Sequence, residues 1–167
     1  MANKEHIVLI GAGLCGSLLA LRLAQRGYSV AVYESRPDMR ITDISAGRSI
    51  NLALSDRGLK ALRLAGVAEK AQELCIPMIG RLIHDREGNT FDSNYSGRTG
   101  ESINSISRGD LNALLLTEAD HFDNLTIYFN CECQFIDLDT NRIDFLNHKT
   151  KKRFSVDAEV ILGTDGA

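Results

Sequence analysis

The fold is decided by residues 7–20, IVLIGAGLCGSLLA, where an apolar run breaks into the pattern G-x-G-x-x-G and then into helical spacing. This order predicts a strand, a phosphate-binding turn and a helix. Gly11 permits the tight turn, Gly13 lets the backbone approach a diphosphate, and Gly16 lets the helix pack closely on the strand. We expect the diphosphate to lie on the unpaired N–H groups at the positive end of the helix dipole.

A second predicted strand strengthens this interpretation. The helix is expected to run over 14–26 and to end at Gly27, and residues 28–33, YSVAVY, then form a strand that leads to Glu34. Glu34 lies 18 residues past Gly16, where a carboxylate accepts hydrogen bonds from the hydroxyls of an adenosine ribose. From these residues alone, a glycine-rich turn in another kind of βαβ protein remains the alternative.

Composition is that of an ordinary globular protein. The 167 residues are 44% hydrophobic and 25% charged, which suits one domain or slightly more. The net charge of -3 gives no basic excess that would attract nucleic acid or an anionic membrane, so neither partner is expected. No apolar run reaches about 18 residues, and no signal-peptide core precedes the first strand. We therefore expect no membrane segment in this chain and a cytoplasmic location.

The cysteines and histidines do not have the spacing of a metal site. The four cysteines include a C-x-C but no C-x-x-C pair, and the four histidines are scattered. We interpret the cysteines as reduced thiols and expect no metal. No Ser/His/Asp or Cys/His arrangement is visible either, so no catalytic residue is assigned.

The middle of the chain predicts a change of architecture. After Glu34 a long connection without clear periodicity leads to a helix over 55–66, capped by Ser55, and to a short helix over 67–74. Two short runs around a polar turn then predict a β-hairpin, at 80–85 and 90–95. A hairpin that interrupts a parallel α/β unit indicates that a second layer begins there.

The Rossmann-like pattern resumes after the hairpin. Ser107 is expected to cap a helix that runs to about His121. Later strands are predicted at 125–129, within 133–146, at 153–156 and at 158–163.

The predicted fold class is therefore α/β, a Rossmann-like GxGxxG βαβ domain with a β-hairpin and meander insertion. We expect 1–75 to form the first part of the nucleotide-binding domain, 76–105 to begin a β layer, and 106–167 to form the second part of the nucleotide-binding domain. The chain stops at a strand-to-turn junction, GTDGA at 163–167, and we therefore expect it to be truncated.

The order of these motifs resembles the FAD-dependent aromatic hydroxylases. Besides G-x-G-x-x-G, the match includes Glu34 with Arg36, Ser107-Arg108 at a helix start, and the closing GTDGA. Within that family, three strings are similar to the kynurenine 3-monooxygenases: GRSINLALS at 47–55, IPMIGRLIH at 76–84 and SISR at 105–108. The resemblance spans essentially the whole of this chain, which corresponds to about the first third of a family member. The chain departs from the pattern at Asn94, where proline is usual, and at Ile79, where a basic residue is common.

The resemblance implies FAD as the cofactor and an FAD-binding role for the Rossmann-like domain. It places the diphosphate on the turn, the adenosine ribose at Glu34 and the adenine side near Cys133. It places Arg108 beside the diphosphate and ribityl chain, and Asp165 near the cofactor and the bound nicotinamide nucleotide. The cofactor-binding residues that it implies are Gly11, Gly13, Cys15, Gly16, Tyr33, Glu34, Ser35, Arg36, Ala53, Arg108, Cys133 and Asp165.

The hairpin is implied to begin the substrate-binding sheet. Arg81 and Tyr95 match the pair that holds the amino-acid carboxylate of L-kynurenine, and a guanidinium fork with a phenol O–H suits that task. The implied activity is an NADPH- and O2-dependent monooxygenase that converts L-kynurenine to 3-hydroxykynurenine, in tryptophan degradation toward quinolinate and NAD biosynthesis. His84 is interpreted as structural.

Two other functions remain open from the sequence. The first is a related FAD-dependent hydroxylase of another aromatic acid or quinone precursor, which would share the FAD motifs without needing Arg81 and Tyr95. The second is a nucleotide-binding fragment without catalysis. Whichever activity the complete protein has, we expect this chain alone to be inactive.

Overall fold

The computed structural model describes residues 5–42, 50–98 and 101–166. Gly47, Arg48 and Ser49 of the family-like string and Ala167 of the closing motif lie outside these residues. The contacts of the chain divide it into two compact units, one of residues 1–47 with 112–167 and the other of residues 48–111.

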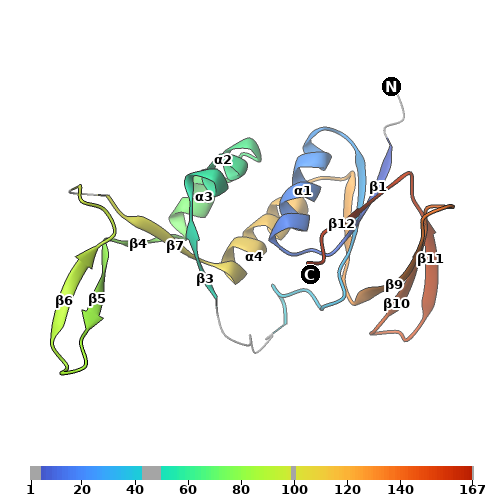
Figure 1. Ribbon diagram of the computed structural model, residues 1–167. Helices are drawn as coiled ribbons and strands as arrows, with labels where there is room; N and C mark the ends of the chain where they lie inside the picture. Colours follow the sequence, from blue (N-terminus) through green and yellow to red (C-terminus); the bar gives the residue numbers. More distant parts are fainter. Residues whose placement is uncertain (1–4, 43–49, 99–100, 167) are drawn as a thin grey trace. The chain divides into compact units, whose positions relative to one another are not determined.

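The first unit is built on a parallel sheet that confirms the predicted strand–turn–helix–strand order (Figure 1). Strand β1 (His6–Ile10) is followed by helix α1 (Leu14–Gln25) and strand β2 (Ser29–Tyr33). Strands β8 (Leu125–Tyr128) and β12 (Val160–Gly163) complete the sheet in the order β12-β1-β2-β8, with every neighbouring pair parallel.

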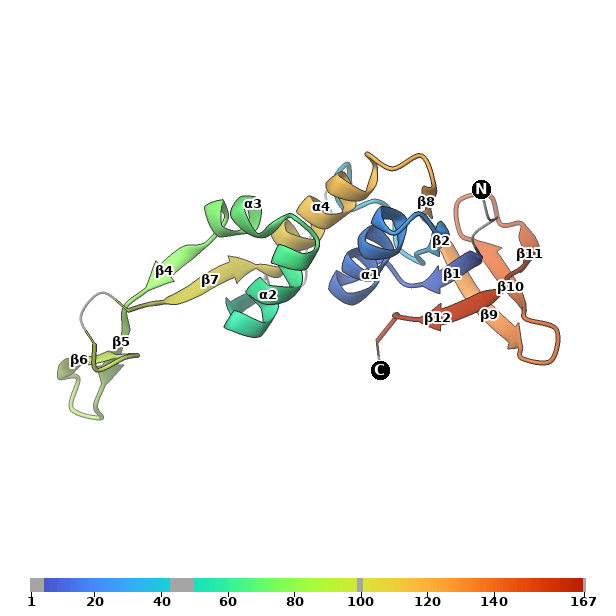
Figure 2. The ribbon, with the colours of Figure 1, turned by 90° about the horizontal axis from the view of Figure 1, so that it is seen from above.

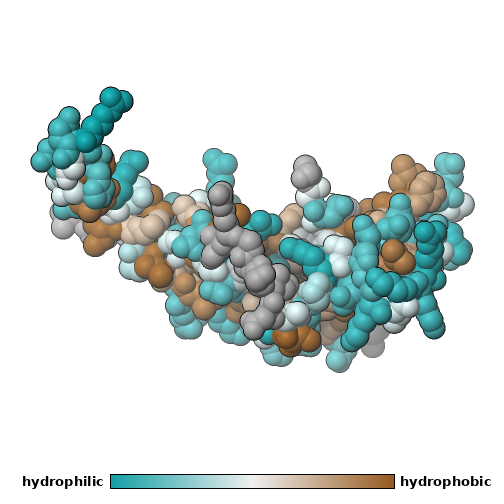
Figure 3. Space-filling view, turned by 90° about the horizontal axis from the view of Figure 1, so that it is seen from below, coloured by the Kyte–Doolittle hydropathy of each residue, from teal (hydrophilic) through white to brown (hydrophobic). Residues whose placement is uncertain are grey.

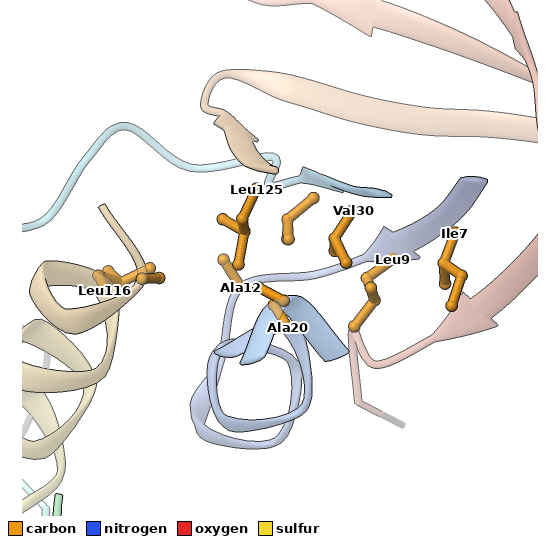
Figure 4. Close-up of a cluster of buried hydrophobic side chains, with 10 residues drawn as sticks. Ile7, Leu9, Ala12, Ala20, Val30, Leu116 and Leu125 are labelled. Carbon is orange, nitrogen blue, oxygen red and sulfur yellow. The ribbon is translucent and has the colours of Figure 1, made fainter. Parts of the chain in front are cut away.

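The two faces of this sheet are covered by different layers. Side chains of a strand point alternately to opposite faces, so Ile7 and Leu9 pack on one side of β1 and Val8 and Ile10 on the other. Helices α1 and α4 (Arg108–Ala119) supply side chains to the first face. The close-up shows side chains of that layer, among them Leu9 and Val30 of the strands, Ala20 of α1 and Leu116 of α4 (Figure 4).

An antiparallel sheet covers the other face of the parallel sheet (Figure 2). It consists of β9 (Cys131–Asp137), β10 (Arg142–Asn147) and β11 (Arg153–Asp157), paired in the order β11-β10-β9. Ile143 and Phe145 of β10 are fully buried against the parallel strands. The predicted antiparallel strands after residue 133 are therefore present, and they complete a three-layer α/β/β unit.

The second unit contains the predicted hairpin and a small sheet that the sequence does not predict. The hairpin pairs β5 (Gly80–His84) with β6 (Thr90–Asn94). The small sheet is antiparallel and has the order β3-β7-β4, from β3 (Asn51–Leu54), β4 (Ile76–Met78) and β7 (Ile103–Ser107). Helices α2 (Asp56–Leu64) and α3 (Ala68–Glu73) connect its first two strands.

The boundaries of the two compact units differ from the boundaries of the functional segments that the sequence predicts. Residues 48–75 group with the hairpin, and helix α4 passes from the second unit into the first at residue 112. The reason is the pairing of β3 with β7, which ties the segment after residue 48 to strands far along the chain. The boundaries at 75 and 105 stay a functional prediction.

Apolar side chains also lie at the surface among polar ones, as the face in Figure 3 shows. The large exposed ones of the hairpin region are Ile76, Ile79, Leu82, Ile83, Phe91 and Tyr95. None of the helices within residues 5–42, 50–98 and 101–166 has the length and apolarity needed to cross a bilayer.

The packing of α1 on β1 depends on Gly16. A Cβ at this position would lie 2.0 Å from the Gly11 carbonyl oxygen and 2.6 Å from Thr164 Oγ1, so the helix cannot approach the strand this closely with any larger residue.

We expect Gly16→Ala to lower the free energy of unfolding of the complete protein by about 2 kcal/mol or more, because backbone atoms must move to accept the methyl group. Urea unfolding followed by circular dichroism measures this change. Gly97→Ala is the control, since a Cβ at that exposed position meets nothing within 4 Å and should change stability by less than about 0.5 kcal/mol. Equal stability of the two variants would contradict the packing argument.

Candidate functional site

The turn after β1 leaves open space where the sequence predicts a diphosphate. Gly11 has φ of +101°, and a Cβ there would lie 2.6 Å from the Asp165 Cα, so this glycine is required by the backbone and by the segment after β12. A Cβ at Gly13 would meet nothing within 4 Å. Gly13 therefore faces a volume that no residue in the described part of the chain fills, as a ligand-cradling turn requires.

Two side chains hold the first peptide group of the turn. The Thr164 hydroxyl donates to the Gly11 carbonyl oxygen at 2.8 Å, and the Ala12 N–H donates to Glu34 Oε2 at 2.8 Å. Two more donors meet at the Ala12 carbonyl oxygen, the Ser17 hydroxyl at 2.9 Å and the Asn112 amide at 3.0 Å. The turn is thus fixed by side chains from four separate places in the sequence.

Helix α1 supplies the anion-binding end of the site. It begins at Leu14 with Gly13 as its N-cap, has no acidic residue in its first turn, and no side chain caps it. The first N–H groups of an α-helix have no partner within the helix, and they carry the positive end of its dipole. An anion on the open side of Gly13 would meet both. Cys15 lies in this first turn with its side chain exposed.

Glu34 is a buried carboxylate held by Arg36. Its residue is 5% exposed, and its Oε1 accepts from the Arg36 N–H at 2.9 Å and the Arg36 Nε at 2.7 Å. Arg36 Nη2 reaches Oε2 at 3.3 Å, which makes the contact two-pronged, and Ser35 Oγ donates to Oε1 at 3.3 Å. The Arg36 side chain itself is 61% exposed, so its charge also faces solvent beside the turn.

These contacts keep Glu34 ionised. Burial works to raise the pKa of the Glu34 carboxyl, but the hydrogen bonds from Arg36 and Ala12 and the charge of Arg36 outweigh it, and the pKa is lowered. The hydrogen bond between the Arg36 and Glu34 side chains also raises the pKa of Arg36. Beyond the predicted ribose contact, Glu34 therefore joins the end of β2 to the turn after β1.

Tyr33 has a packing role in this structure. Its ring stacks between Tyr128, at 4.8 Å between centroids, and Phe145, at 4.1 Å. Burial, with smaller effects from Tyr128 and Cys131, raises its pKa to about 12. The residue is 6% exposed, and its predicted cofactor contact stays a prediction.

Cys133 and Asp165 lie near one another beside the parallel sheet. Burial and then the Asp165 charge raise the pKa of the Cys133 thiol, which therefore stays neutral at pH 7. The backbone of Asp165 borders Gly11, as its 2.6 Å approach to the Gly11 Cβ position shows. Contacts of both residues with a cofactor remain predictions.

Ala53 and Arg108 belong to the second unit. Ala53 lies in β3 opposite Ser105 of β7, and Arg108 is the first residue of α4, where its N–H donates to the Ile50 carbonyl at 3.0 Å. Ser107 Oγ accepts from the Asp110 N–H at 3.3 Å, which confirms the predicted cap. The cofactor roles of Ala53 and Arg108 stay predictions.

The hairpin brings Arg81 and Tyr95 together. The Arg81 guanidinium carbon lies 5.3 Å from the centre of the Tyr95 ring, in a cation–π contact. Residues directly opposite in an antiparallel ladder share a face, and Arg81 pairs with Ser93 while Ile83 pairs with Phe91. One face of the hairpin therefore carries Arg81 and Ser93 beside the exposed apolar side chains of Ile83 and Phe91.

The sequence interpretation did not assign three residues that hold the turn: Ser17, Asn112 and Thr164. Ser17 and Thr164 lie within motifs that the sequence analysis quotes, so a local pattern could have predicted their contact with the turn. Asn112 is 100 residues from Ala12, and no local pattern connects the two. Across residues 5–42, 50–98 and 101–166, no three His, Cys, Asp or Glu side chains are grouped as metal ligands would be.

Comparison with known sequences finds one matching family and several longer relatives. The family described as "FAD binding domain" matches residues 4–167. A kynurenine 3-monooxygenase from Legionella pneumophila (strain Corby) is 41% identical over 163 residues, covering 98% of this chain and 36% of that protein. Those from Cytophaga hutchinsonii and Drosophila melanogaster are 44% and 38% identical, covering 36% and 35% of their lengths and 98% and 99% of this chain. The chain thus spans about a third of these relatives.

Solved structures share the fold at low sequence identity. p-Nitrophenol 4-monooxygenase PnpA from Pseudomonas putida DLL-E4 superposes with a TM-score of 0.78 at 18% identity, covering 100% of this chain and 42% of that chain. The flavin-dependent monooxygenase PieE, solved with FAD and substrate, gives 0.79 at 16% identity, covering 98% and 30%. The Rossmann-like architecture of this chain is therefore also found within part of each of these two longer proteins.

We expect Glu34→Gln to lower the free energy of unfolding of the complete protein by about 2 kcal/mol at pH 7, because the amide –NH2 would face N–H donors. Since the pKa of Glu34 is lowered in the folded state, its contribution is present above the unfolded value of about 4.3 and is lost as pH falls through the folded value. The difference from the wild type should therefore shrink below about pH 4.3. Urea unfolding at several pH values measures it.

The matched control for this measurement is Glu73→Gln, an exposed residue at the end of α3, which should change stability by less than about 0.5 kcal/mol. A Glu34→Gln variant as stable as this control at pH 7 would show that the carboxylate does not hold the turn.

Proposed function

We propose, on the premise that the chain belongs to the FAD-binding domain family, that it forms the amino-terminal part of a flavoprotein monooxygenase that hydroxylates L-kynurenine with NADPH and O2. The observation that carries the substrate assignment is the contact between Arg81 and Tyr95 on the hairpin. Because the chain spans 36% of the Legionella relative, the activity is proposed for the complete protein.

The residues of the first unit fit the FAD diphosphate and ribose. The open side of Gly13 gives the diphosphate access to the α1 N-terminus, and the exposed Arg36 guanidinium adds a positive charge beside it. The Glu34 carboxylate stays ionised at neutral pH and is an acceptor for ribose hydroxyls. Bound FAD supplies the redox chemistry by which electrons from NADPH activate O2 for hydroxylation.

The hairpin residues bind and orient the substrate. The Arg81 guanidinium offers a planar pair of donors to the amino-acid carboxylate, and the Tyr95 O–H adds a directional donor. Ile83 and Phe91 share the Arg81 face and give the aromatic ring an apolar surface that excludes water. We assign no catalytic side chain, because holding the ring in a reactive orientation is the task that these residues can perform.

A cytoplasmic location is part of the same proposal. All four cysteines are free thiols, a state typical of a reducing compartment. The alternative, a related hydroxylase of another aromatic acid or quinone precursor, would share the FAD-binding turn but would not need Arg81 with Tyr95.

We expect L-kynurenine to stimulate NADPH oxidation by the complete protein, with 3-hydroxykynurenine formed in matching amount. Absorbance of NADPH, chromatography of the product and a hydrogen peroxide assay measure the three quantities together. Stimulation that yields only hydrogen peroxide, or no stimulation, would leave a flavin-dependent hydroxylase of another substrate.

We expect Arg81→Ala to raise the KM for L-kynurenine by about 10- to 100-fold, since a charge-assisted hydrogen-bond pair to the carboxylate is lost. Arg86→Ala is the matched control, because Arg86 is an exposed arginine in the turn of the same hairpin. Steady-state kinetics of both variants make the comparison. An unchanged KM in Arg81→Ala would refute the assignment of the carboxylate site.

A further inference from the structure

We propose that Asn112 is a positioning residue for the diphosphate turn: it holds the Ala12–Gly13 peptide group so that the Gly13 N–H faces the ligand. Asn112 lies on α4 and is 6% exposed, and it reaches the turn across 100 residues of sequence. The inference rests on the proposed binding of FAD, because the diphosphate is the group that the Gly13 N–H would meet.

The hydrogen bonds of Asn112 fix the orientation of its amide. Nδ2 donates to the Ala12 carbonyl oxygen at 3.0 Å and lies 3.2 Å from Met39 Sδ. Oδ1 accepts from Ser17 Oγ at 3.2 Å. Acceptors lie on the nitrogen side and a donor on the oxygen side, so the amide is satisfied in one orientation only.

The geometry of the peptide bond carries this restraint to the ligand side. All peptide bonds of the described residues are trans, so the Ala12 C=O and the Gly13 N–H point in opposite directions. The Ala12 oxygen points inward, toward Asn112 and Ser17, which is 1% exposed. The Gly13 N–H therefore points away from the core, on the residue whose Cβ position meets nothing within 4 Å.

Besides Asn112, this carbonyl accepts a hydrogen bond from Ser17. The Ser17 hydroxyl has one proton, and that proton is shared between the Ala12 oxygen at 2.9 Å and Asn112 Oδ1 at 3.2 Å. The Asn112 amide has two protons, so one of them stays on the Ala12 oxygen whichever of the two acceptors takes the Ser17 proton. A polar side chain among the buried leucines Leu111, Leu115 and Leu116 of α4 is unfavourable unless hydrogen bonded, and here the bonds go to the turn.

Loss of the amide donor would let the Ala12–Gly13 peptide rotate in part of the population. A rotated peptide turns a carbonyl oxygen toward the diphosphate, and such molecules do not bind. The apparent Kd rises as the competent fraction falls. One hydrogen bond of ordinary strength changes such an equilibrium by at most about tenfold, so Asn112→Leu should weaken FAD binding by about two- to tenfold.

The experiment compares Asn112→Leu with Asn124→Leu in the complete protein after removal of the flavin. Asn124 donates from Nδ2 to the carbonyls of Ala24 at 2.9 Å and Tyr28 at 2.7 Å, so it makes the same kind of contact at the opposite end of α1. Urea unfolding measures stability, and quenching of flavin fluorescence measures the Kd for FAD. Both variants should lose stability, and only Asn112→Leu should lose FAD affinity.

A second variant tests the donor itself. Asn112→Asp keeps the shape of the side chain, but its carboxylate turns an oxygen toward the Ala12 carbonyl. Burial raises the pKa of a carboxyl group, and the protonated form regains an O–H donor. The ratio of the FAD Kd of this variant to that of the wild type should therefore fall from pH 8 to pH 6. A ratio that does not change with pH would contradict a donor role for the side chain at this position.

The outcomes separate this inference from the proposed function. FAD affinity in Asn112→Leu within twofold of that in Asn124→Leu, or a pH-independent ratio for Asn112→Asp, would overturn the role of Asn112 alone. Failure of the wild-type protein to bind FAD would overturn the proposed function and this inference together.

Discussion

The structure depends on the close contact between the first turn of α1 and the end of β1. A Cβ at Gly16 would lie 2.0 Å from the Gly11 carbonyl oxygen, so the first turn of the helix approaches the end of the strand this closely because residue 16 is glycine. This contact aims the helix N-terminus at the turn. It also leaves the Gly11 oxygen within reach of Thr164 Oγ1, which attaches the segment after β12 to the same place.

A buried charge then joins the remaining strand to this turn. Glu34 ends β2, and its carboxylate accepts from Ala12 in the turn and from Arg36 beyond it. A buried carboxylate without such donors would protonate or destabilise the fold, whereas these donors lower its pKa. The acidic residue that nucleotide-binding folds use for ribose is thus also a structural link between two neighbouring parallel strands.

The sequence predicts those parts of the fold that depend on neighbouring residues. The turn, the caps at Ser55 and Ser107 and the hairpin each follow from local spacing, and each is present. Strands β3, β4 and β7 have three to five residues each, too few for a clear period, and they form because distant segments pair. The role of Asn112 could not be predicted for a related reason, since only the folded chain brings an amide on α4 to a carbonyl in the turn.

The two proposed binding regions differ in how firmly the chain holds them. The turn is hydrogen bonded to the side chains of Thr164, Ser17 and Asn112 and, through the Gly11 N–H, to the Tyr33 backbone carbonyl. The strands beneath it are buried on both faces. Arg81 and Tyr95 lie instead on a hairpin of two strands, where Ile79 is 66% and Phe91 50% exposed. An isolated pair of strands is at best marginally stable. The cofactor therefore meets a preformed turn, whereas the order of the substrate-binding side chains depends on what packs on the apolar face that surrounds them.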